Sequence, residues 1–230
     1  TARRLDVKVC FHPGQFCCLA SVNPDVVDRS IEEFEYHVDM ARWMGYGKSW
    51  HDGCKINVHV SGKNGPEGFR KQLPRLSKEA RNLLTIENDE MGHGLEHTLE
   101  LADEVALVLD IHHHWIRAEE YIEAKDDRVK RVIDSWRGVR PTLHYSYSRD
   151  EHLAPAGLGD KTHTEMHDIK MLLERGCKKQ KLRAHSDLLP NQKVNAWALS
   201  FGEHFDIQTE AKGKNMAAEQ LYTQWLNTGA

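Results

Sequence analysis

The sequence alternates short runs of β-forming residues with longer amphipathic stretches. The β-type runs are, in chain order, "LDVKVCF", "KINVHV", "LLTIEN", "VALVLDI" and "VRPTLHYS". Helical periodicity follows them over residues 24–45, 66–80, 94–103, 115–134 and 163–176. Alternation of this kind is typical of βα units, whose strands form a parallel sheet. We therefore expect an α/β fold.

The C-terminal part begins with "LRAHSD", which is either a short strand or a connection. It continues with "HFDIQTEAK" as a strand and residues 212–226 as the last helix. Residues 145–162 form a long polar segment, which predicts a functional loop. No linker-like composition interrupts the sequence, so residues 1–230 are expected to form a single domain.

Composition narrows the classes of protein to consider. With 40% hydrophobic and 29% charged residues the chain is typical of a globular protein, and no apolar run reaches the roughly 20 residues of a membrane span. We expect an intracellular protein, cytoplasmic or nucleoid-associated. The net charge of -4 argues against bulk electrostatic binding of nucleic acid. Basic clusters at residues 70–81 and 170–183 are either local contacts for phosphates or solvated helix faces.

The β-type runs share a feature at their C-terminal ends: each ends in or just before a residue type that binds metals. These residues are His12, His59, Glu87, Asp110 with His113, His144, His185 and Glu210. The carboxyl ends of parallel strands converge when a sheet closes or curves strongly. Carboxylates and imidazoles gathered there repel one another and lose hydration unless a cation lies among them. The pattern therefore predicts bound metal ions.

The donor types and their number constrain the metals. Imidazole with carboxylate suits Zn, Mn or Fe, and eight donors exceed one coordination sphere, so two or three divalent ions with bridging carboxylates are expected. The alternative is that the strand ends acquired solvated polar residues independently. His112 and His114 need separate explanations. The remaining histidines singled out as surface residues are His51, His93, His97, His152, His163, His167 and His204.

Seven short motifs, in this order, resemble those of the UV damage endonuclease family. They are "FHPGQF" (11–16), "NVHVSG" (57–62), "IEND" (86–89), "LDIHHH" (109–114), "LHYS" (143–146), "HSD" (185–187) and "DIQTEAKGK" (206–214). The family is related in architecture to endonuclease IV-type apurinic endonucleases. The resemblance covers about residues 5–215 and implies a TIM (β/α) barrel whose first one or two βα units lie outside this chain.

The resemblance implies a DNA repair endonuclease that nicks the strand immediately 5′ to a UV photoproduct, leaving a 3′-hydroxyl and a 5′-phosphate. The partner would be damaged double-stranded DNA, with no membrane, bound by a monomer. Three alternatives remain open: an endonuclease at abasic sites, a metal-dependent sugar isomerase or epimerase on the same barrel, and a truncated relative that binds metal or DNA without cutting.

The resemblance also implies how the donors divide. His12, His59 and Glu87 would hold one metal, and Glu87 would bridge to a second metal. Asp110, His144 and Glu210 would complete that second site, while His113 and His185 would belong to a third. Glu87, Asp110 and Glu210 are the predicted catalytic carboxylates. Mn²⁺ is the expected ion, with Zn²⁺ or Mg²⁺ as alternatives.

Three further expectations concern the substrate and the third metal. Gln15 and Phe16 would enter the duplex and probe the damaged dinucleotide, although relatives usually carry Tyr where this chain has Phe16. Lys178, Lys179 and Lys181 would flank the DNA. Thr142 occupies the position of a lysine that is modified in some relatives, which predicts a third metal site that is weaker or completed by water.

Overall fold

The computed structural model describes residues 1–14, 16–159 and 164–228. Its six strands pair in chain order, β1-β2-β3-β4-β5-β6, and every pair of neighbours is parallel. This confirms the α/β fold with a parallel sheet. The chain divides into two compact units, Thr1–Val108 with Lys130–Val139 and Leu109–Val129 with Arg140–Ala230. The boundary falls within β4, and we describe each unit by itself.

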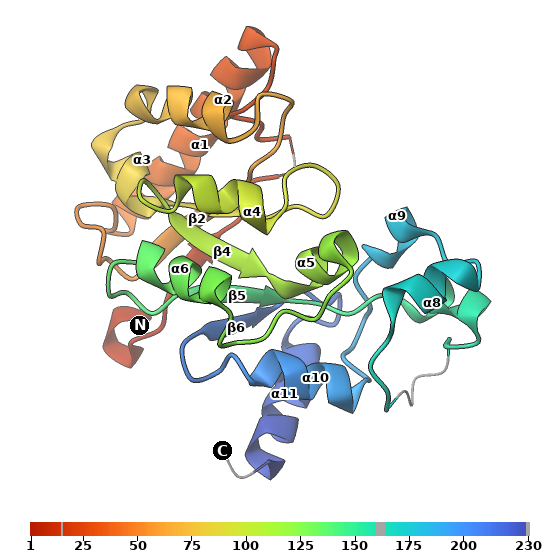
Figure 1. Ribbon diagram of the computed structural model, residues 1–230. Helices are drawn as coiled ribbons and strands as arrows, with labels where there is room; N and C mark the ends of the chain where they lie inside the picture. The colour runs from red at the N-terminus through yellow and green to blue at the C-terminus, as the bar shows by residue number, and fades with distance from the viewer. Residues whose placement is uncertain (15, 160–163, 229–230) are drawn as a thin grey trace. The chain divides into compact units, whose positions relative to one another are not determined.

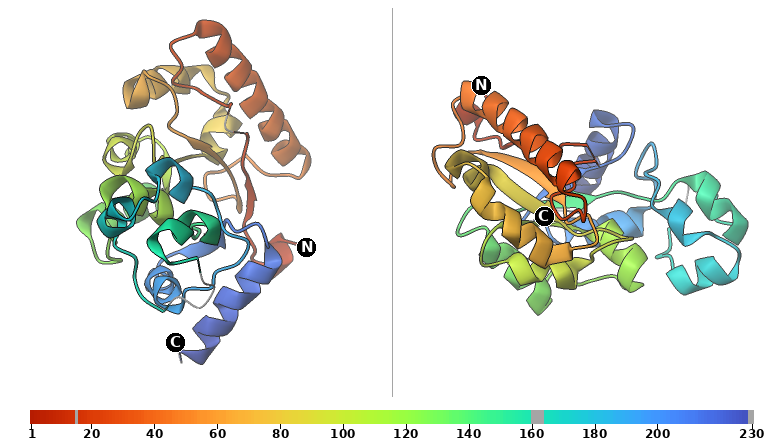
Figure 2. Two further views of the ribbon diagram at one scale, coloured as in Figure 1. Left: turned by 90° about the vertical axis from the view of Figure 1, so that its right-hand side faces the viewer. Right: turned by 90° about the horizontal axis from the view of Figure 1, so that it is seen from above.

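Unit 1 holds the N-terminal strands and the helices that follow them (Figures 1 and 2). Its strands are β1 (Val9–Phe11), β2 (Cys54–His59), β3 (Leu84–Glu87) and the first residues of β4 (Ala106–Asp110). Its helices are α1 (Pro24–Trp43), α2 (Gly65–Gln72), α3 (Lys78–Leu83), α4 (Leu95–Thr98) and most of α6 (Asp127–Ser135). Short 3-10 turns cover Arg3–Leu5, Leu73–Arg75 and Leu99–Leu101.

Helix α1 illustrates why these residues form a helix. Asn23 caps it by accepting a hydrogen bond from the backbone N–H of Asp25, and Pro24 supplies a first helical residue with the φ angle already suited to the helix. Its buried side chains recur at helical spacing and pack on α3 and β2: Val27, Ser30, Phe34, Val38 and Ala41. The apolar stripe therefore positions the helix on the sheet.

Unit 2 holds the end of β4 and the remaining elements (Figure 1). Its strands β5 (Thr142–Tyr145) and β6 (Asp206–Thr209) pair in register with one another. Its helices are α5 (Ile111–Ala118), α7 (Asp150–Leu153), α8 (Ile169–Glu174), α9 (Lys179–Leu182), α10 (Gln192–Leu199) and α11 (Asn215–Asn227), with a 3-10 turn at Ala154–Ala156. Helix α11 packs on α10 and on β6.

Two sequence-based boundaries were wrong. The single helix expected over residues 115–134 is two helices, because Glu119 adopts a left-handed conformation (φ 61°) that ends α5. The helix expected over 66–80 is instead α2 followed by the 3-10 turn Leu73–Arg75, and the extended Leu76 separates that turn from α3. Of the two structures expected for "LRAHSD", the connection is confirmed, because the segment continues from the end of α9 and meets Ser148 only in an isolated antiparallel bridge at His185.

One histidine expected at the surface is buried. His167 is 3% exposed, and its Nε2 lies 2.5 Å from the hydroxyl of Tyr147. The hydroxyl of Tyr121 donates to the His167 carbonyl and accepts from its N–H. The bond to Tyr147 thus offsets the cost of burying the imidazole, and the bonds to Tyr121 satisfy the backbone groups of the same residue. His163 lies outside the described residues. Within the described ranges, no helix has the length and hydrophobicity that a membrane span requires.

Unit 1 buries a lysine at the start of β2. Lys55 is 1% exposed, and its Nζ donates to the carbonyls of Trp50 (3.0 Å) and Asn82 (2.6 Å) while lying 4.1 Å from the Trp50 ring centroid. Arg137 lies over the same ring, at 4.0 Å. Burial, together with Arg137 and Lys8, lowers the pKa of the Lys55 amine to about 7, against the opposing effects of Cys54 and Asp52.

This lysine makes stability depend on pH. Between about pH 7 and its ordinary pKa of 10.5 the unfolded chain binds one more proton at Lys55 than the folded chain, so the free energy of unfolding rises with pH in that window. We predict that between pH 7 and about pH 8.5 the native protein gains up to about 2 kcal/mol more than Lys55→Met. Urea unfolding at several pH values measures this. The exposed Lys48→Met should follow the native curve, and equal slopes for all three proteins would contradict the prediction.

Candidate metal centre

The pairing of β2 with β3 brings four polar side chains to the same face of unit 1. Their register joins Asn57 to Thr85 and His59 to Glu87. Because side chains alternate along a strand, residues two apart project from the same face. The alternation in "NVH" and "TIE" therefore places His59 and Glu87 at the ends of their strands, with Asn57 and Thr85 one step behind them. His12 follows β1 directly.

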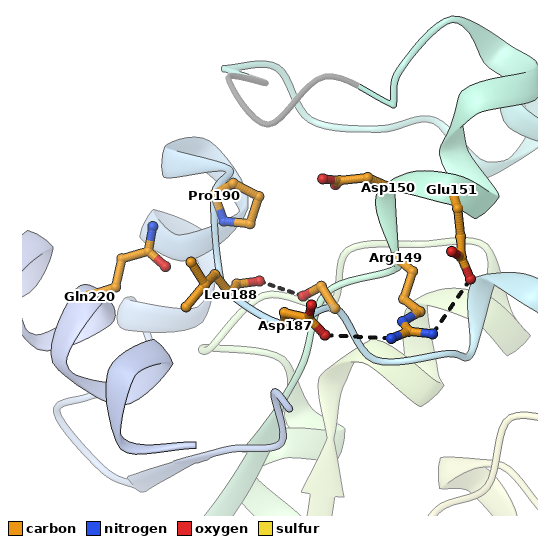
Figure 3. A pocket seen from close by; sticks show the side chains of 8 residues that line it. Arg149, Asp150, Glu151, Asp187, Leu188, Pro190 and Gln220 are labelled. Carbon is orange, nitrogen blue, oxygen red and sulfur yellow. Dashed lines mark hydrogen bonds and ion pairs between the residues drawn. The ribbon is translucent and has the colours of Figure 1, made fainter. Parts of the chain in front are cut away.

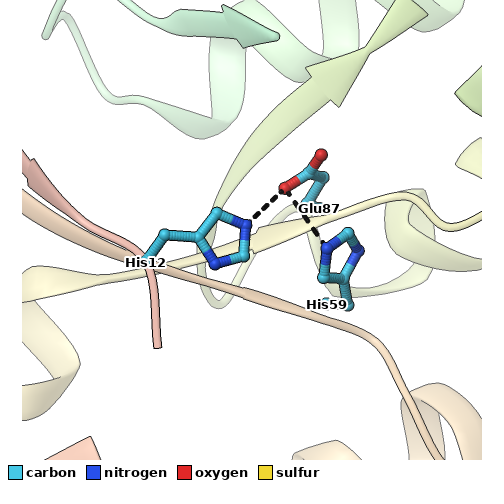
Figure 4. A group of neighbouring side chains, drawn as sticks. All are labelled: His12, His59 and Glu87. Atoms are coloured by element: carbon cyan, nitrogen blue, oxygen red, sulfur yellow. Dashed lines mark ion pairs between the residues drawn. The ribbon is translucent and has the colours of Figure 1, made fainter. Parts of the chain in front are cut away.

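The three donors His12, His59 and Glu87 lie together (Figure 4). Glu87 Oε2 is 3.3 Å from His12 Nε2 and 3.8 Å from His59 Nε2, and the two imidazole centroids are 5.3 Å apart. One donor atom of each residue lies within 4.8 Å of the other two. The Glu87 side chain is completely buried, whereas the histidine side chains are 31% and 21% exposed. The group is therefore open to solvent on the histidine side.

Hydrogen bonds orient two of these donors. The Asn57 amide donates to Glu87 Oε2, and the Thr85 hydroxyl donates to Asn57 Oδ1 at 3.0 Å, which fixes the direction of the amide. His12 Nδ1 lies 3.0 Å from the Pro13 carbonyl, to which it donates. That bond leaves the lone pair of Nε2 facing Glu87. Sequence reasoning missed Asn57 and Thr85, although the i, i+2 spacing before each donor could have indicated them.

The donor set fits a divalent metal ion. Two imidazole nitrogens and a carboxylate oxygen are ligands that Zn²⁺, Mn²⁺ and Fe²⁺ accept. Orientation of ligands by hydrogen bonds to backbone and side-chain groups is typical of metal sites. A buried carboxylate without a counter-charge is costly, so a cation among these donors would also offset the burial of Glu87.

The other five predicted donors lie in unit 2, and each of them lies near at least one other. Asp110 caps α5 by accepting from the backbone N–H of His113 at 2.7 Å, and its second oxygen is 3.7 Å from His113 Nδ1. The β4–β5 register places Asp110 beside His144. Glu210, directly after β6, has one oxygen 3.3 Å from His144 Nδ1 and the other 4.0 Å from His185 Nε2. The rings of His113 and His185 are 6.3 Å apart.

The two histidines that flank His113 have structural partners. His112 lies between two serines, with Ser146 Oγ 2.7 Å from Nδ1 and Ser148 Oγ 3.1 Å from Nε2. Ser148 donates its own proton to the Leu182 carbonyl, so it accepts from His112 Nε2–H and Ser146 donates to Nδ1. Burial, with His113 and His185 nearby, lowers the pKa of His112, which is consistent with this neutral form. His114 Nε2 is 2.9 Å from Glu120 Oε1.

The residues predicted to contact DNA differ in their exposure and in their ion pairs. Phe16 is 77% exposed, which excludes a core role, and Gln15 lies outside the described residues. Lys179 pairs with Glu119 Oε1 at 3.0 Å, so much of its charge is neutralised. Lys178 and Lys181 are exposed on and beside α9, and within the described residues neither side chain makes a hydrogen bond or ion pair.

A model of one protein family matches nearly the whole chain. The match covers residues 1–228, and the family is UV-endonuclease UvdE. The chain belongs to the UvdE family. Its order of motifs is thus the order of the family, and the donors described above lie within the matched residues.

Three curated relatives of this chain are longer than the part that it matches. It is 28% identical over 170 residues to the UV-damage endonuclease of Neurospora crassa, covering 67% of this chain and 26% of the relative. It is 28% identical over 158 residues to the UV DNA damage endonuclease of Bacillus velezensis, covering 65% and 48%. It is 27% identical over 219 residues to a putative UV-damage endonuclease of Acanthamoeba polyphaga mimivirus, covering 90% and 63%. The chain therefore spans less than two thirds of these relatives.

Two solved structures share the fold. The crystal structure of SacUVDE superposes with a TM-score of 0.71 at 24% identity, covering 99% of this chain and 67% of that one. Endonuclease IV from Thermus thermophilus superposes with a TM-score of 0.60 at 14% identity, covering 96% and 77%. Both likenesses concern the fold alone.

If unit 1 binds a metal through these donors, loss of a donor or of its support should weaken binding. We predict that Asn57→Ala lowers Mn²⁺ affinity about 10- to 100-fold and that His59→Ala lowers it at least as much. The exposed His51→Ala serves as the control and should bind as the native protein does. Isothermal titration, together with the shift in melting temperature on adding Mn²⁺, measures the effect. Native-like titrations of Asn57→Ala and His59→Ala would exclude the site.

Proposed function

We propose that this chain is the catalytic part of a metal-dependent DNA repair endonuclease that nicks the strand immediately 5′ to UV photoproducts. The observation that carries the proposal is the match of the UvdE family over residues 1–228 of a chain whose strand ends carry imidazole and carboxylate donors. The products would be a 3′-hydroxyl and a 5′-phosphate. The six parallel strands would then be part of a (β/α) barrel whose first one or two units lie outside this chain.

The donors would hold two or three divalent ions. His12, His59 and Glu87 would bind the first, Glu87 with Asp110, His144 and Glu210 the second, and His113 with His185 the third. Mn²⁺ is the expected ion. Bound metals supply three things that phosphodiester hydrolysis needs: neutralisation of the phosphate charge, a hydroxide at neutral pH and stabilisation of the departing oxygen.

The protein's own residues keep the donors ready for this role. Asn57 and Thr85 hold the Glu87 carboxylate in one orientation, and the Pro13 carbonyl holds the His12 ring. Asp110 is positioned by its cap on α5, and Ser146 and Ser148 hold His112 between them behind His113 and His185. Rigid support of this kind reduces the reorganisation that a site undergoes during reaction. Thr142, 4% exposed on β5, offers no carboxylate, so the third site would use water.

The nicking assay tests this function. A supercoiled plasmid is treated with the protein and Mn²⁺, with and without prior UV irradiation, and with abasic sites as a third substrate. We predict nicking of the irradiated plasmid alone, and a loss of at least about 100-fold in Glu87→Ala, because removing a ligand costs no less than removing a group that orients one. Glu32→Ala, which changes an exposed glutamate of α1, should nick normally.

Other outcomes of that assay would point to the alternatives. Nicking confined to abasic sites would favour an apurinic endonuclease. Absence of nicking with Mn²⁺, Mg²⁺ and Zn²⁺ would favour a binding protein without catalysis. Full nicking by Glu87→Ala would overturn the proposed metal mechanism.

Phe16 would read the lesion together with Gln15. A ring that stacks in the gap left by displaced bases is worth about 1–3 kcal/mol per base. We therefore predict that Phe16→Ala loses affinity of this size for a duplex with one photoproduct while its affinity for the undamaged duplex and its metal content stay constant. Phe16→Tyr should bind like the native protein or more tightly. Fluorescence anisotropy with both duplexes measures this, and discrimination retained by Phe16→Ala would remove Phe16 from lesion recognition.

A further inference from the structure

The turn Lys212–Gly213–Lys214 is held against the backbone that follows His185. The N–H of Lys212 donates to the Ser186 carbonyl at 2.9 Å, and the N–H of Gly213 donates to the Asp187 carbonyl at 2.7 Å. The turn begins two residues after Glu210. It is therefore fixed next to two of the proposed metal ligands, one along the chain and one across these hydrogen bonds.

Gly213 permits this close approach. A Cβ at this position would lie 2.4 Å from the Asp187 carbonyl oxygen and 3.1 Å from Leu188 Cδ2. The first distance is too short for any side chain, because it involves a backbone atom that cannot move aside. The backbone of the turn, which carries the two lysines, is thus held close to the backbone of Asp187.

Lys214 holds a backbone conformation that glycine normally adopts. Its φ is 49° and its ψ is -117°, and the N–H of Met216 donates to the Gly213 carbonyl at 2.9 Å. These values correspond to the first central residue of a type II′ turn, where an L side chain is strained. Lys214 is also the N-cap of α11, yet its side chain makes no capping hydrogen bond to any described residue. Neither the turn nor the helix explains a lysine here.

Both lysines present their charge to solvent. Lys212 and Lys214 are exposed, and no hydrogen bond or ion pair of either side chain occurs among the residues that the structure describes. The nearby Asp187 carboxylate lies 3.5 Å from Arg149, which also reaches Glu151 (Figure 3). That contact reduces the negative charge beside the turn. The two lysines thus form a cationic pair, on a backbone that is held in place, next to the proposed metal ligands.

The hollow beside the turn is not suited to bind an anion, because most of the charged side chains around it are negative. It has a volume of about 340 Å³, and Figure 3 shows three carboxylates around it, those of Asp150, Glu151 and Asp187, against the single cation Arg149. An anion approaching this part of unit 2 is therefore attracted by the lysines of the turn and repelled by the hollow.

We propose that the Lys212–Gly213–Lys214 turn binds two backbone phosphates of the DNA strand, one at each lysine, adjacent to the phosphodiester that is cut. The proposal rests on the proposed function, because that function makes DNA the ligand. A pair of cations on a held backbone positions the strand without reading its sequence, as phosphate contacts do. The strained conformation of Lys214 is retained because the position of its side chain matters more than the stability of the turn.

Equilibrium binding separates this role from a structural one. Affinity for a photoproduct duplex is measured without Mn²⁺ between about 50 and 200 mM NaCl, where each phosphate contact contributes about -0.9 to the slope of log K against log salt. Lys212→Gln and Lys214→Gln should each reduce the slope by about one contact, and the double variant by about two. Lys125→Gln is the matched control, because this exposed lysine lies among Glu123, Asp126 and Asp127. It should keep the native slope.

Lys214→Gly is the decisive variant. It removes the strain together with the charge, so its melting temperature should equal or exceed that of the native protein while its slope falls as in Lys214→Gln. A lysine with only a structural role would change the melting temperature and leave the slope unchanged, which would overturn the proposal. In steady-state nicking we expect KM to rise with little change in kcat, since a phosphate contact made equally in the ground and transition states affects binding alone.

The two proposals fail in different ways. A protein that binds the duplex but never nicks it refutes the proposed nuclease, while the salt slopes still test the turn. A protein that nicks irradiated DNA and whose lysine variants keep the native slope refutes the turn alone.

Discussion

The register of the parallel strands is the constraint on which the rest of the site depends. Pairing of His59 with Glu87 in β2 and β3, and of Asp110 with His144 in β4 and β5, brings donors from different strands side by side. A slip of one residue in either pair would turn a whole strand over and move its donor to the opposite face. The apolar residues of the same strands prevent that slip, because Ile56, Val58 and Ile86 are completely or almost completely buried on the other face.

Packing elsewhere in unit 1 fixes the strands from their other end. Trp136 donates its indole N–H to the Leu107 carbonyl, and Leu107 N–H donates to the hydroxyl of Ser135, so the end of α6 is bound to β4. The Trp136 ring packs with Ala106 and Val108 in the core. Buried tryptophans that find an acceptor contribute both apolar area and a directional bond. Burial of the Glu87 carboxylate is costly. That residue therefore lies on strands whose stability comes from apolar packing.

Individual residues show why part of the site could be predicted and part could not. His12, Glu87 and Glu210 stand out because each lies at or directly after the C-terminal end of a β-type run, and strand periodicity is a strong local signal. Asn57 and Thr85 carry only the weaker signal of lying two residues before a donor, because their importance comes from a hydrogen-bond chain across two strands. The same holds for Lys179, which belongs to a basic cluster in the sequence but pairs with Glu119, sixty residues earlier in the chain. Helix ends were also missed, since Glu119 ends α5 through its backbone conformation.

The sequence by itself determined the class of fold, the order of the strands and the residue types at their ends, because hydrophobic periodicity and turn residues act over a few neighbouring positions. It determined family membership as well, through motifs that stay in fixed order. Only the tertiary structure decided which donors lie within reach of one another, which lysines keep their charge free for an external anion, and that Lys214 adopts a conformation suited to glycine. Those properties arise from contacts between segments far apart in the chain, and no local pattern encodes a distance across space.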